Sequence, residues 1–265
     1  MREFKKVIRV AGLLGAGLVL GGAGPASSQP LGGEGYALVY NGAVSDADST
    51  EAIVEVVKQV GLPIRYVSDL QTLPALLKNA RVVIIGGTDD DVQPLLEAFT
   101  PPVSSALKAY LRNGGRYLGM CGGAFLASTG WPDEGGFVPA LGIIPAESDA
   151  YDEDFAAKIY PVQWRGAQRL MYYQAGPEFT LRQSPEAVQV VARFANQQPA
   201  ALISAYGQGR VAVSGPHPEA PESWKDNAED GDKMQANVHL AEQLLRDLLA
   251  DQPVAAGNSA AKARP

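Results

Sequence analysis

Residues 114–125 read GGRYLGMCGGAF and contain the single cysteine of the chain, Cys121. The apolar run 116–120 predicts a buried strand, and the glycines around Cys121 predict a tight turn into a helix. A strained strand-to-helix turn of the form Gly-x-nucleophile-x-Gly holds a nucleophile at the carboxyl end of a strand. The N–H groups and the positive dipole end of the following helix would favour the thiolate. We therefore expect an exposed thiol nucleophile at Cys121; the alternative is a small apolar residue buried in the core.

Upstream of this stretch, short apolar runs alternate with helical patterns. Continuous apolar strands separated by helices are typical of a parallel sheet that is covered on both faces. We therefore expect a doubly wound α/β domain, mostly parallel and flanked by helices, of the flavodoxin-like class. The expected strands are 36–40, 63–67, 81–87 and 116–120, and the expected helices are 48–61 (capped by Asp48 or Ser49), 70–79 and 103–115.

Downstream of the cysteine the pattern is weaker. Residues 131–182 predict irregular excursions and short strands, because glycine, proline, aromatic and acidic residues are interspersed there. Three later strands, 187–195, 199–206 and 209–215, are expected to be antiparallel or mixed at the edge of the sheet, and 233–249 is expected to be a helix. A single domain over 35–250 accounts for the pattern, and the small, polar residues of 251–265 predict a disordered tail.

The first residues have the composition of an export signal. A basic segment, MREFKKVIR, precedes an apolar segment rich in glycine and alanine and a run of small residues. Residues 1–28 are therefore predicted to be a signal peptide that is cleaved, so that the mature protein is periplasmic or secreted without a stable membrane anchor. An uncleaved anchor is the alternative, although the apolar segment is short for a membrane span.

Charge and motif content exclude several classes of function. The chain has 29 acidic and 22 basic residues and a formal charge of −7, which disfavours nucleic acid as a partner. No glycine-rich phosphate loop occurs, so no nucleotide cofactor is expected. A calcium loop at 226–237 has Ala228 at a ligand position and Asn237 in place of the closing glutamate, and one cysteine with two separated histidines does not suggest zinc. We expect no metal and no cofactor.

One histidine is well placed to act as a base for the thiol. His217 follows a predicted strand in GPHPE, at the edge where α/β active sites form, whereas His239 lies in the amphipathic pattern of a predicted helix. Pro218 keeps His217 extended, so the side chain of Glu219, two residues further on, points to the same side. Glu219 would then hold the imidazole in one tautomer. An incidental His and Glu in a proline-rich loop is the alternative.

Acyl chemistry also needs donors for a developing oxyanion. The backbone N–H of Gly122, directly after the nucleophile, is one candidate, and the turn at Gly86 and Gly87 offers Gly87 as the second. A Gly-Gly turn can also exist only because its backbone requires positive φ.

These motifs together resemble the class I glutamine amidotransferase-like superfamily, and more narrowly the biotin-protein-ligase N-terminal-domain-like family. The resemblance covers about 36–249. It implies Cys121 as nucleophile, His217 as base, Glu219 as the residue that orients it, and Gly87 and Gly122 as oxyanion donors. It also implies a pocket lined by Asn41, Asp89, Tyr173 and Glu178. The segments that carry it are VYNGAVSD (39–46), VIIGGTDDD (83–91), GGRYLGMCGGAF (114–125), RLMYYQAGPEF (169–179) and GQGRVAVSGPHPE (207–219).

Two departures from the family pattern bear on function. Ile85 precedes Gly86 where many amidotransferases carry proline, and export removes the chain from the ATP that most amidotransferases use. We therefore expect a cysteine-dependent hydrolase that acts on a small-molecule or peptide amide through a thioester. A non-catalytic binding or redox-sensing module with the same pocket is the alternative, and an assembly partner in an envelope complex is a third hypothesis. The oligomeric state stays open.

Overall fold

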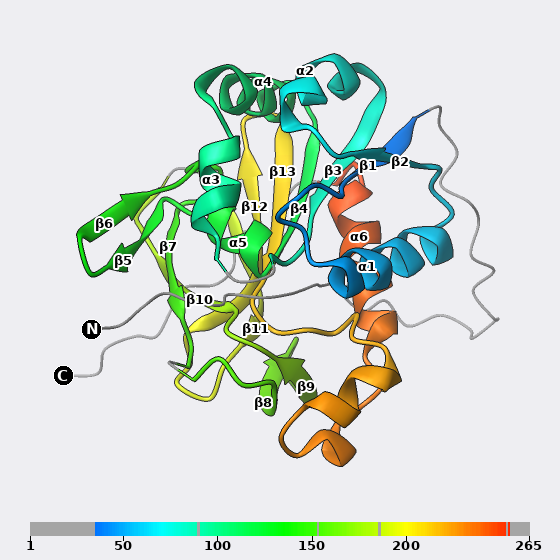
Figure 1. Cartoon of the computed structure of the whole chain (residues 1–265), viewed down its shortest axis with the longest axis vertical. Helices are drawn as coiled ribbons and strands as arrows, with labels where there is room; N and C mark the ends of the chain where they lie inside the picture. Colours follow the sequence, from blue (N-terminus) through cyan, green and yellow to red (C-terminus); the bar gives the residue numbers. More distant parts are fainter. Residues whose placement is uncertain (1–34, 89–90, 153, 185–186, 253, 255–265) are drawn as a thin grey trace.

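A mixed sheet runs through the centre of the molecule (Figure 1). The structure, a computed structural model, describes residues 35–88, 91–152, 154–184, 187–252 and 254, so the predicted signal peptide and most of the predicted tail lie outside the described residues. Within them the sheet has nine strands in the order β2-β1-β3-β4-β13-β12-β11-β8-β9. The first five are mutually parallel: β2 (Ile64–Val67), β1 (Tyr36–Tyr40), β3 (Ala80–Ile85), β4 (Arg116–Met120) and β13 (Gly209–Ser214).

The last part of the sheet is antiparallel, and the position expected for β13 was wrong. β13 lies between β4 and β12 in the middle of the sheet, not at its edge, and all its residues are buried. The edge is formed instead by a hairpin from the stretch that was expected to contain irregular excursions and short strands. The antiparallel strands are β12 (Pro199–Tyr206), β11 (Val188–Arg193), β8 (Lys158–Trp164) and β9 (Ala167–Tyr173).

Four more strands of the 131–182 region lie outside the main sheet. They form the hairpin β5 (Gly130–Asp133) with β6 (Gly136–Pro139) and the antiparallel pair β7 (Ala146–Ala150) with β10 (Pro177–Leu181). Figure 1 shows β5 and β6 projecting on the side of α3 and α5. These short strands place a small subdomain beside the carboxyl end of β4.

The helices follow the predicted pattern with shifted ends. The side chain of Asp46 accepts a hydrogen bond from the Ser49 N–H, so the first long helix is capped two residues before the predicted Asp48. The last helix begins at Val238, because the residues up to Lys233 form a 3₁₀ turn. The helices are α1 (Ala47–Val60), α2 (Leu73–Leu76), α3 (Gln93–Ala98), α4 (Pro101–Arg112), α5 (Gly122–Ala127) and α6 (Val238–Leu249), with 3₁₀ turns at Leu70–Thr72, Leu77–Asn79, Glu222–Asn227 and Gly231–Lys233.

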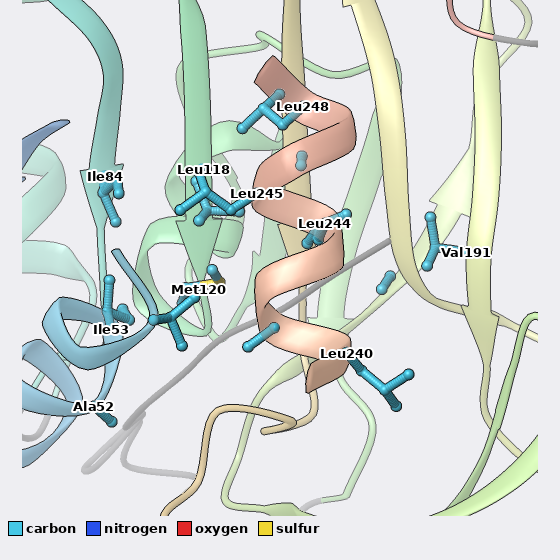
Figure 2. Packing of buried hydrophobic residues seen from close by; sticks show 14 of the residues in the cluster. Ala52, Ile53, Ile84, Leu118, Met120, Val191, Leu240, Leu244, Leu245 and Leu248 are labelled. Carbon is cyan, nitrogen blue, oxygen red and sulfur yellow. The ribbon is translucent and has the colours of Figure 1, made fainter. Parts of the chain in front are cut away.

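The helices bury both faces of the sheet. Alternating side chains of β4 point to opposite cores: Leu118 and Met120 pack with α1 and α6, and Tyr117 packs with α2 and α4. Figure 2 shows Leu244 and Leu245 of α6 directed at the strands. This is the doubly wound arrangement that the alternating sequence pattern predicts. In the described residues, no helix is long and apolar enough to cross a membrane.

Two arginines at the amino end of the sheet hold the end of α6. Arg116 Nε donates to the Leu248 carbonyl at 2.8 Å, and Arg210 Nη1 donates to the Ala250 carbonyl at 2.7 Å. These carbonyls have no partner inside the helix, and the guanidinium charges also face the negative end of its dipole.

Arg210→Ala is therefore expected to lower the free energy of unfolding by about 1.5–3 kcal/mol, the usual range for a hydrogen bond to a charged group. Urea denaturation measures the loss. Arg246→Ala is the matched control, because Arg246 donates to the Gln59 carbonyl at the exposed surface. Equal losses in the two variants would contradict the role assigned to Arg210.

Candidate active site

Cys121 occupies a strained turn between β4 and α5. Its φ is 41° and its ψ is −100°, an arrangement that costs a non-glycine residue roughly 1–3 kcal/mol and is concentrated at functional sites. The N–H groups of Ala124 and Phe125 both donate to the Cys121 carbonyl at 2.9 Å, so the helix begins immediately after the turn. The predicted strand, turn and helix are confirmed.

The glycines of the turn are required by close backbone contacts. A Cβ at Gly119 would lie 2.4 Å from the Gly123 carbonyl oxygen, and a Cβ at Gly123 would lie 2.2 Å from the Ile85 carbonyl oxygen. The Gly123 N–H also donates to the Gly86 carbonyl at 3.0 Å. The absence of side chains thus lets α5 rest directly on the ends of β3 and β4.

Gly123→Ala is expected to destabilise the protein by about 3 kcal/mol, because the backbone of α5 must move away from β3. Gly135→Ala is the control: a Cβ at Gly135, in the β5–β6 turn, meets nothing within 4 Å. Thermal or urea unfolding measures both variants. A loss below 1 kcal/mol at position 123 would show that the strand-to-helix turn at Cys121, here called the elbow, tolerates a side chain.

The expectation of an exposed thiol was wrong. Cys121 is 0% exposed, and its thiol donates a long hydrogen bond, 3.9 Å, to the Gln174 carbonyl. An apolar cluster packs around it and comes from segments on both sides of the elbow in the sequence. The cluster contains Val92, Phe125 and Trp131, with Leu96, Val138, Ala140, Ala150 and Phe155 packed against it.

The strand next to β4 is β13, and it leads into the loop that carries the predicted base, His217, at the same edge of the sheet. Met120 pairs with Ser214 in register, and the Cys121 N–H donates to the Ser214 carbonyl at 3.0 Å. His217 follows Ser214 by three residues and is 1% exposed. Its backbone N–H donates to the Tyr172 carbonyl at 2.7 Å. Cys121 and His217 therefore follow the carboxyl ends of adjacent parallel strands.

Glu219 faces the imidazole from the same loop. Its Oε1 lies 3.9 Å from His217 Nδ1, which is longer than a hydrogen bond, and both side chains are fully buried. Burial raises the pKa of the Glu219 carboxyl well above its ordinary value. The two side chains point to the same side of the loop, as the extended geometry before Pro218 predicts.

Aromatic rings form the walls around the imidazole. The ring of His217 contacts Tyr172 and Trp224 edge-on, with centroid separations of 4.8 and 5.6 Å. Neither aromatic residue was identified from sequence. Trp224 follows Glu219 by five residues, but the sequence does not show that the chain turns back towards His217 there. Tyr172 lies far from GPHPE in the chain and reaches His217 through the bridge between β9 and the His217 loop.

The two predicted oxyanion donors have different surroundings. Gly122 N–H opens α5 directly after Cys121. The Gly87 N–H, however, already donates to Ser49 Oγ at 3.0 Å. The next amide is closer to the elbow: a Cβ at Gly122 would lie 3.2 Å from the Thr88 backbone nitrogen. The Thr88 amide is therefore a further candidate for the second donor, one residue after the predicted Gly87.

The predicted pocket residues serve different roles. Asn41 is exposed after β1, and its backbone N–H donates to the Val67 carbonyl. Glu178 accepts a hydrogen bond from Asn196 Nδ2 at 2.5 Å, and its pKa is raised by partial burial. Asp89 lies outside the described residues. None of these contacts joins Asn41 or Glu178 to the elbow.

Tyr173 is a core residue whose hydroxyl holds a turn. It is 0% exposed and packs with Tyr151, Tyr160 and Phe194. Its hydroxyl donates to the Gly176 carbonyl at 3.0 Å and accepts from the Asp152 N–H at 3.0 Å. This turn carries the Gln174 carbonyl that accepts the hydrogen bond from the Cys121 thiol. The Tyr173 hydroxyl therefore helps to hold that carbonyl in place.

The same turn is packed against the loop that carries His217. A Cβ at Gly215 would lie 1.9 Å from the Pro177 carbonyl oxygen, and a Cβ at Gly176 would lie 2.0 Å from the Gly215 carbonyl oxygen. Two segments far apart in the sequence thus reach backbone contact next to the elbow. No group of three or more histidine, cysteine, aspartate or glutamate side chains that could hold a metal occurs in the part of the chain that the structure describes.

Comparison with known proteins supports the fold and the family of this chain. The family model described as biotin-protein ligase, N terminal, matches residues 36–132 and 150–252. A solved glutamine amidotransferase is 19% identical with a TM-score of 0.52, covering 70% of this chain and 91% of its own. A glutamine amidotransferase from Thermotoga maritima is 13% identical with a TM-score of 0.52, covering 82% and 94%. No curated protein matches in sequence.

At these identities the structural likeness establishes the fold alone, which is that of the class I glutamine amidotransferases. The family is established separately, because the matching model spans most of the chain in two segments that include Cys121, His217 and Glu219. The chain therefore belongs to the biotin-protein ligase N-terminal family.

Proposed function

We propose that this protein is an exported cysteine hydrolase that cleaves an amide or a related acyl bond with Cys121, His217 and Glu219. The observation that carries the proposal is the strained, positive-φ cysteine at the end of β4, beside the strand whose loop holds the buried His217 and Glu219. Strain at a nucleophile that is flanked by a buried base and carboxyl is typical of an acyl-transfer site.

The proposed reaction proceeds in two steps. His217 takes the thiol proton, the sulfur forms a bond to the carbonyl carbon, and the N–H groups of Gly122 and Thr88 hold the oxyanion. The C–N bond then breaks, and the amine leaves with the proton from His217. Water attacks the thioester with His217 as base, which releases the acid and restores the thiol. Glu219 stabilises the imidazolium in both steps.

The proposal is tested by the release of 4-nitrophenolate from 4-nitrophenyl acetate, with mass spectrometry of the acid-quenched protein. We expect a burst close to the protein concentration and an acetyl group on Cys121 that is later lost to water. Cys121→Ala should give no burst and no adduct. A wild-type protein that stays unmodified at Cys121 would refute the hydrolase.

A second candidate function is a non-catalytic module that uses the same pocket and the Cys121 thiol for binding or redox sensing, and it requires that an oxidant or ligand reach the covered thiol. The two candidates predict different outcomes in hydrogen peroxide. A sensing thiol would form a sulfenic acid that dimedone traps while ester turnover is absent, whereas the hydrolase would turn over ester without requiring oxidation.

Export is also part of the proposal. It rests on the basic and apolar segments of residues 1–28. Sequencing the amino terminus of the protein isolated from an expressing bacterium tests it: a terminus near Gln29 in the periplasm or the medium is expected, and an intact Met1 in the cytoplasm would overturn it.

A further inference from the structure

The apolar cluster around Cys121 has a consequence for the substrate. Phe125 comes from α5, directly after the nucleophile, and Trp131 comes from β5; their rings meet edge-on with centroids 5.8 Å apart. Val92 enters from the residue before α3 and is 3% exposed. Cys121 thus shares one buried cluster with an aliphatic and two aromatic side chains that come from separate segments.

Backbone groups also lie next to the sulfur. The Gln174 carbonyl lies 3.9 Å from Cys121 Sγ, and the Gly122 N–H begins α5 next to it. Backbone groups of this kind recognise the reacting carbonyl and not the remainder of the acyl group. The apolar cluster is the set of side chains packed with Cys121 that the remainder of the acyl group could meet.

Because Cys121 is fully buried, a ligand that reaches the sulfur must displace some of the side chains of the apolar cluster. Trp131 is the outermost large member at 5% exposed, and it pairs with Val138 across the β5–β6 hairpin. An apolar group that replaces these contacts is removed from water, which stabilises the complex by about 25 cal/mol per Å² of apolar area buried. A carboxamide would lose its hydration against side chains that offer it no hydrogen bond.

We infer that Cys121 accepts an apolar acyl group, aliphatic or aromatic, held by Val92, Phe125 and Trp131, and that glutamine is a poor acyl donor. This inference rests on the proposed function and names its substrate class. Sites that are built from apolar side chains discriminate between small acyl groups by about 10–200-fold.

The test compares the 4-nitrophenyl esters of N-acetyl-leucine and N-acetyl-glutamine as acyl donors for the wild-type protein. Single-turnover 4-nitrophenolate release gives the acylation rate, and mass spectrometry places the adduct on Cys121. We expect the leucine ester to react at least 10-fold faster after correction for spontaneous hydrolysis. Equal rates, or a faster glutamine ester, would overturn the inference.

Variants connect the preference to the cluster. Trp131→Ala and the milder Val92→Thr, which adds a hydroxyl at nearly constant shape, should each lower the leucine-to-glutamine ratio by at least 3-fold. Phe137→Ala is the matched control on the same hairpin, because Phe137 is 48% exposed, and it should keep the wild-type ratio. An unchanged ratio in both Trp131→Ala and Val92→Thr would also overturn the inference.

The outcomes separate the inference from the function on which it rests. Absence of a Cys121 adduct with either ester refutes the hydrolase and the inference together. A Cys121 adduct that forms preferentially from the glutamine ester refutes only the apolar acyl group and leaves the hydrolase intact.

Discussion

His217→Ala is expected to lower the rate of Cys121 acylation at pH 7 by about 10²–10⁴-fold, the usual contribution of a positioned general base. Without the imidazole the thiol must ionise unaided. His217 is fully buried at the loop after β13, next to the strand that ends in the nucleophile, so no solvent group replaces it at the site. The measurement is single-turnover release of 4-nitrophenolate from 4-nitrophenyl acetate between pH 6 and 10.

The chain supplies its own control for this experiment. It has two histidines, and His239 is exposed on α6, so His239→Ala should retain the wild-type rate and pH profile. Added imidazole should restore part of the rate to His217→Ala, provided that the vacated space beside Tyr172 and Trp224 admits the base. A His217→Ala rate above one tenth of wild type would remove the base from the proposed triad.

Glu219→Gln is expected to make the protein more stable at pH 8 and much less active. Burial raises the pKa of Glu219, so the folded protein holds a proton that the unfolded chain releases near pH 4.5. The stability that this proton contributes is complete below pH 4.5 and is lost as the pH rises towards the folded pKa. A neutral glutamine of the same shape avoids the loss, which we expect to be about 1–3 kcal/mol at pH 8.

The same substitution removes the ionised form of Glu219, which is the form that stabilises the imidazolium and whose share grows as the pH rises. We expect a loss of about 10²-fold or more in acylation rate, because a carboxylate in this role is the partner of the proton that His217 carries. Urea denaturation at pH 5 and pH 8, together with the ester assay, measures both effects. The stability of the variant should exceed that of wild type more at pH 8 than at pH 5.

Glu222→Gln is the control, because Glu222 is an exposed residue of the same segment that pairs with Lys225 at 2.7 Å. Its change in stability should stay below 1 kcal/mol, with no effect on the rate. If Glu219→Gln were destabilising and active, Glu219 would be a structural residue whose carboxylate the fold needs, and the proposed triad would lose its third member. Opposite effects on stability and rate are what a strained functional group produces.

Much of the site could be predicted because its parts are local. The glycines around Cys121 limit the backbone to a turn that no bulkier residues can form, and Pro218 keeps His217 extended with Glu219 on the same side. Both constraints act within a few residues, so they are visible in the order of amino acids. The doubly wound fold was predictable for the same reason, because each apolar run or helical pattern indicates by itself whether its segment is a buried strand or a helix.

Errors arose where distant segments meet. Nothing near Gly87 in the sequence indicates that Ser49 accepts its N–H, and this contact is the reason that we propose Thr88 as the second oxyanion donor. The central position of β13 likewise depends on the antiparallel strands β8, β9, β11 and β12. These strands come between β4 and β13 in the chain, but in the sheet they continue on the side of β13 that faces away from β4. The short turn between β12 and β13 predicts that these two strands pair, but it does not predict which strand lies on the other side of β13.

The sequence by itself determined that a cysteine would stand at a strand-to-helix elbow and that a histidine and a glutamate would share one side of a loop. Only the tertiary structure decided that the thiol is covered, because Val92, Phe125 and Trp131 reach it from three separate elements. Backbone geometry is set by neighbours along the chain, whereas the surroundings of a sulfur atom are set by whichever segments the fold packs against it. The feature on which the inferred acyl preference rests is therefore a property of packing.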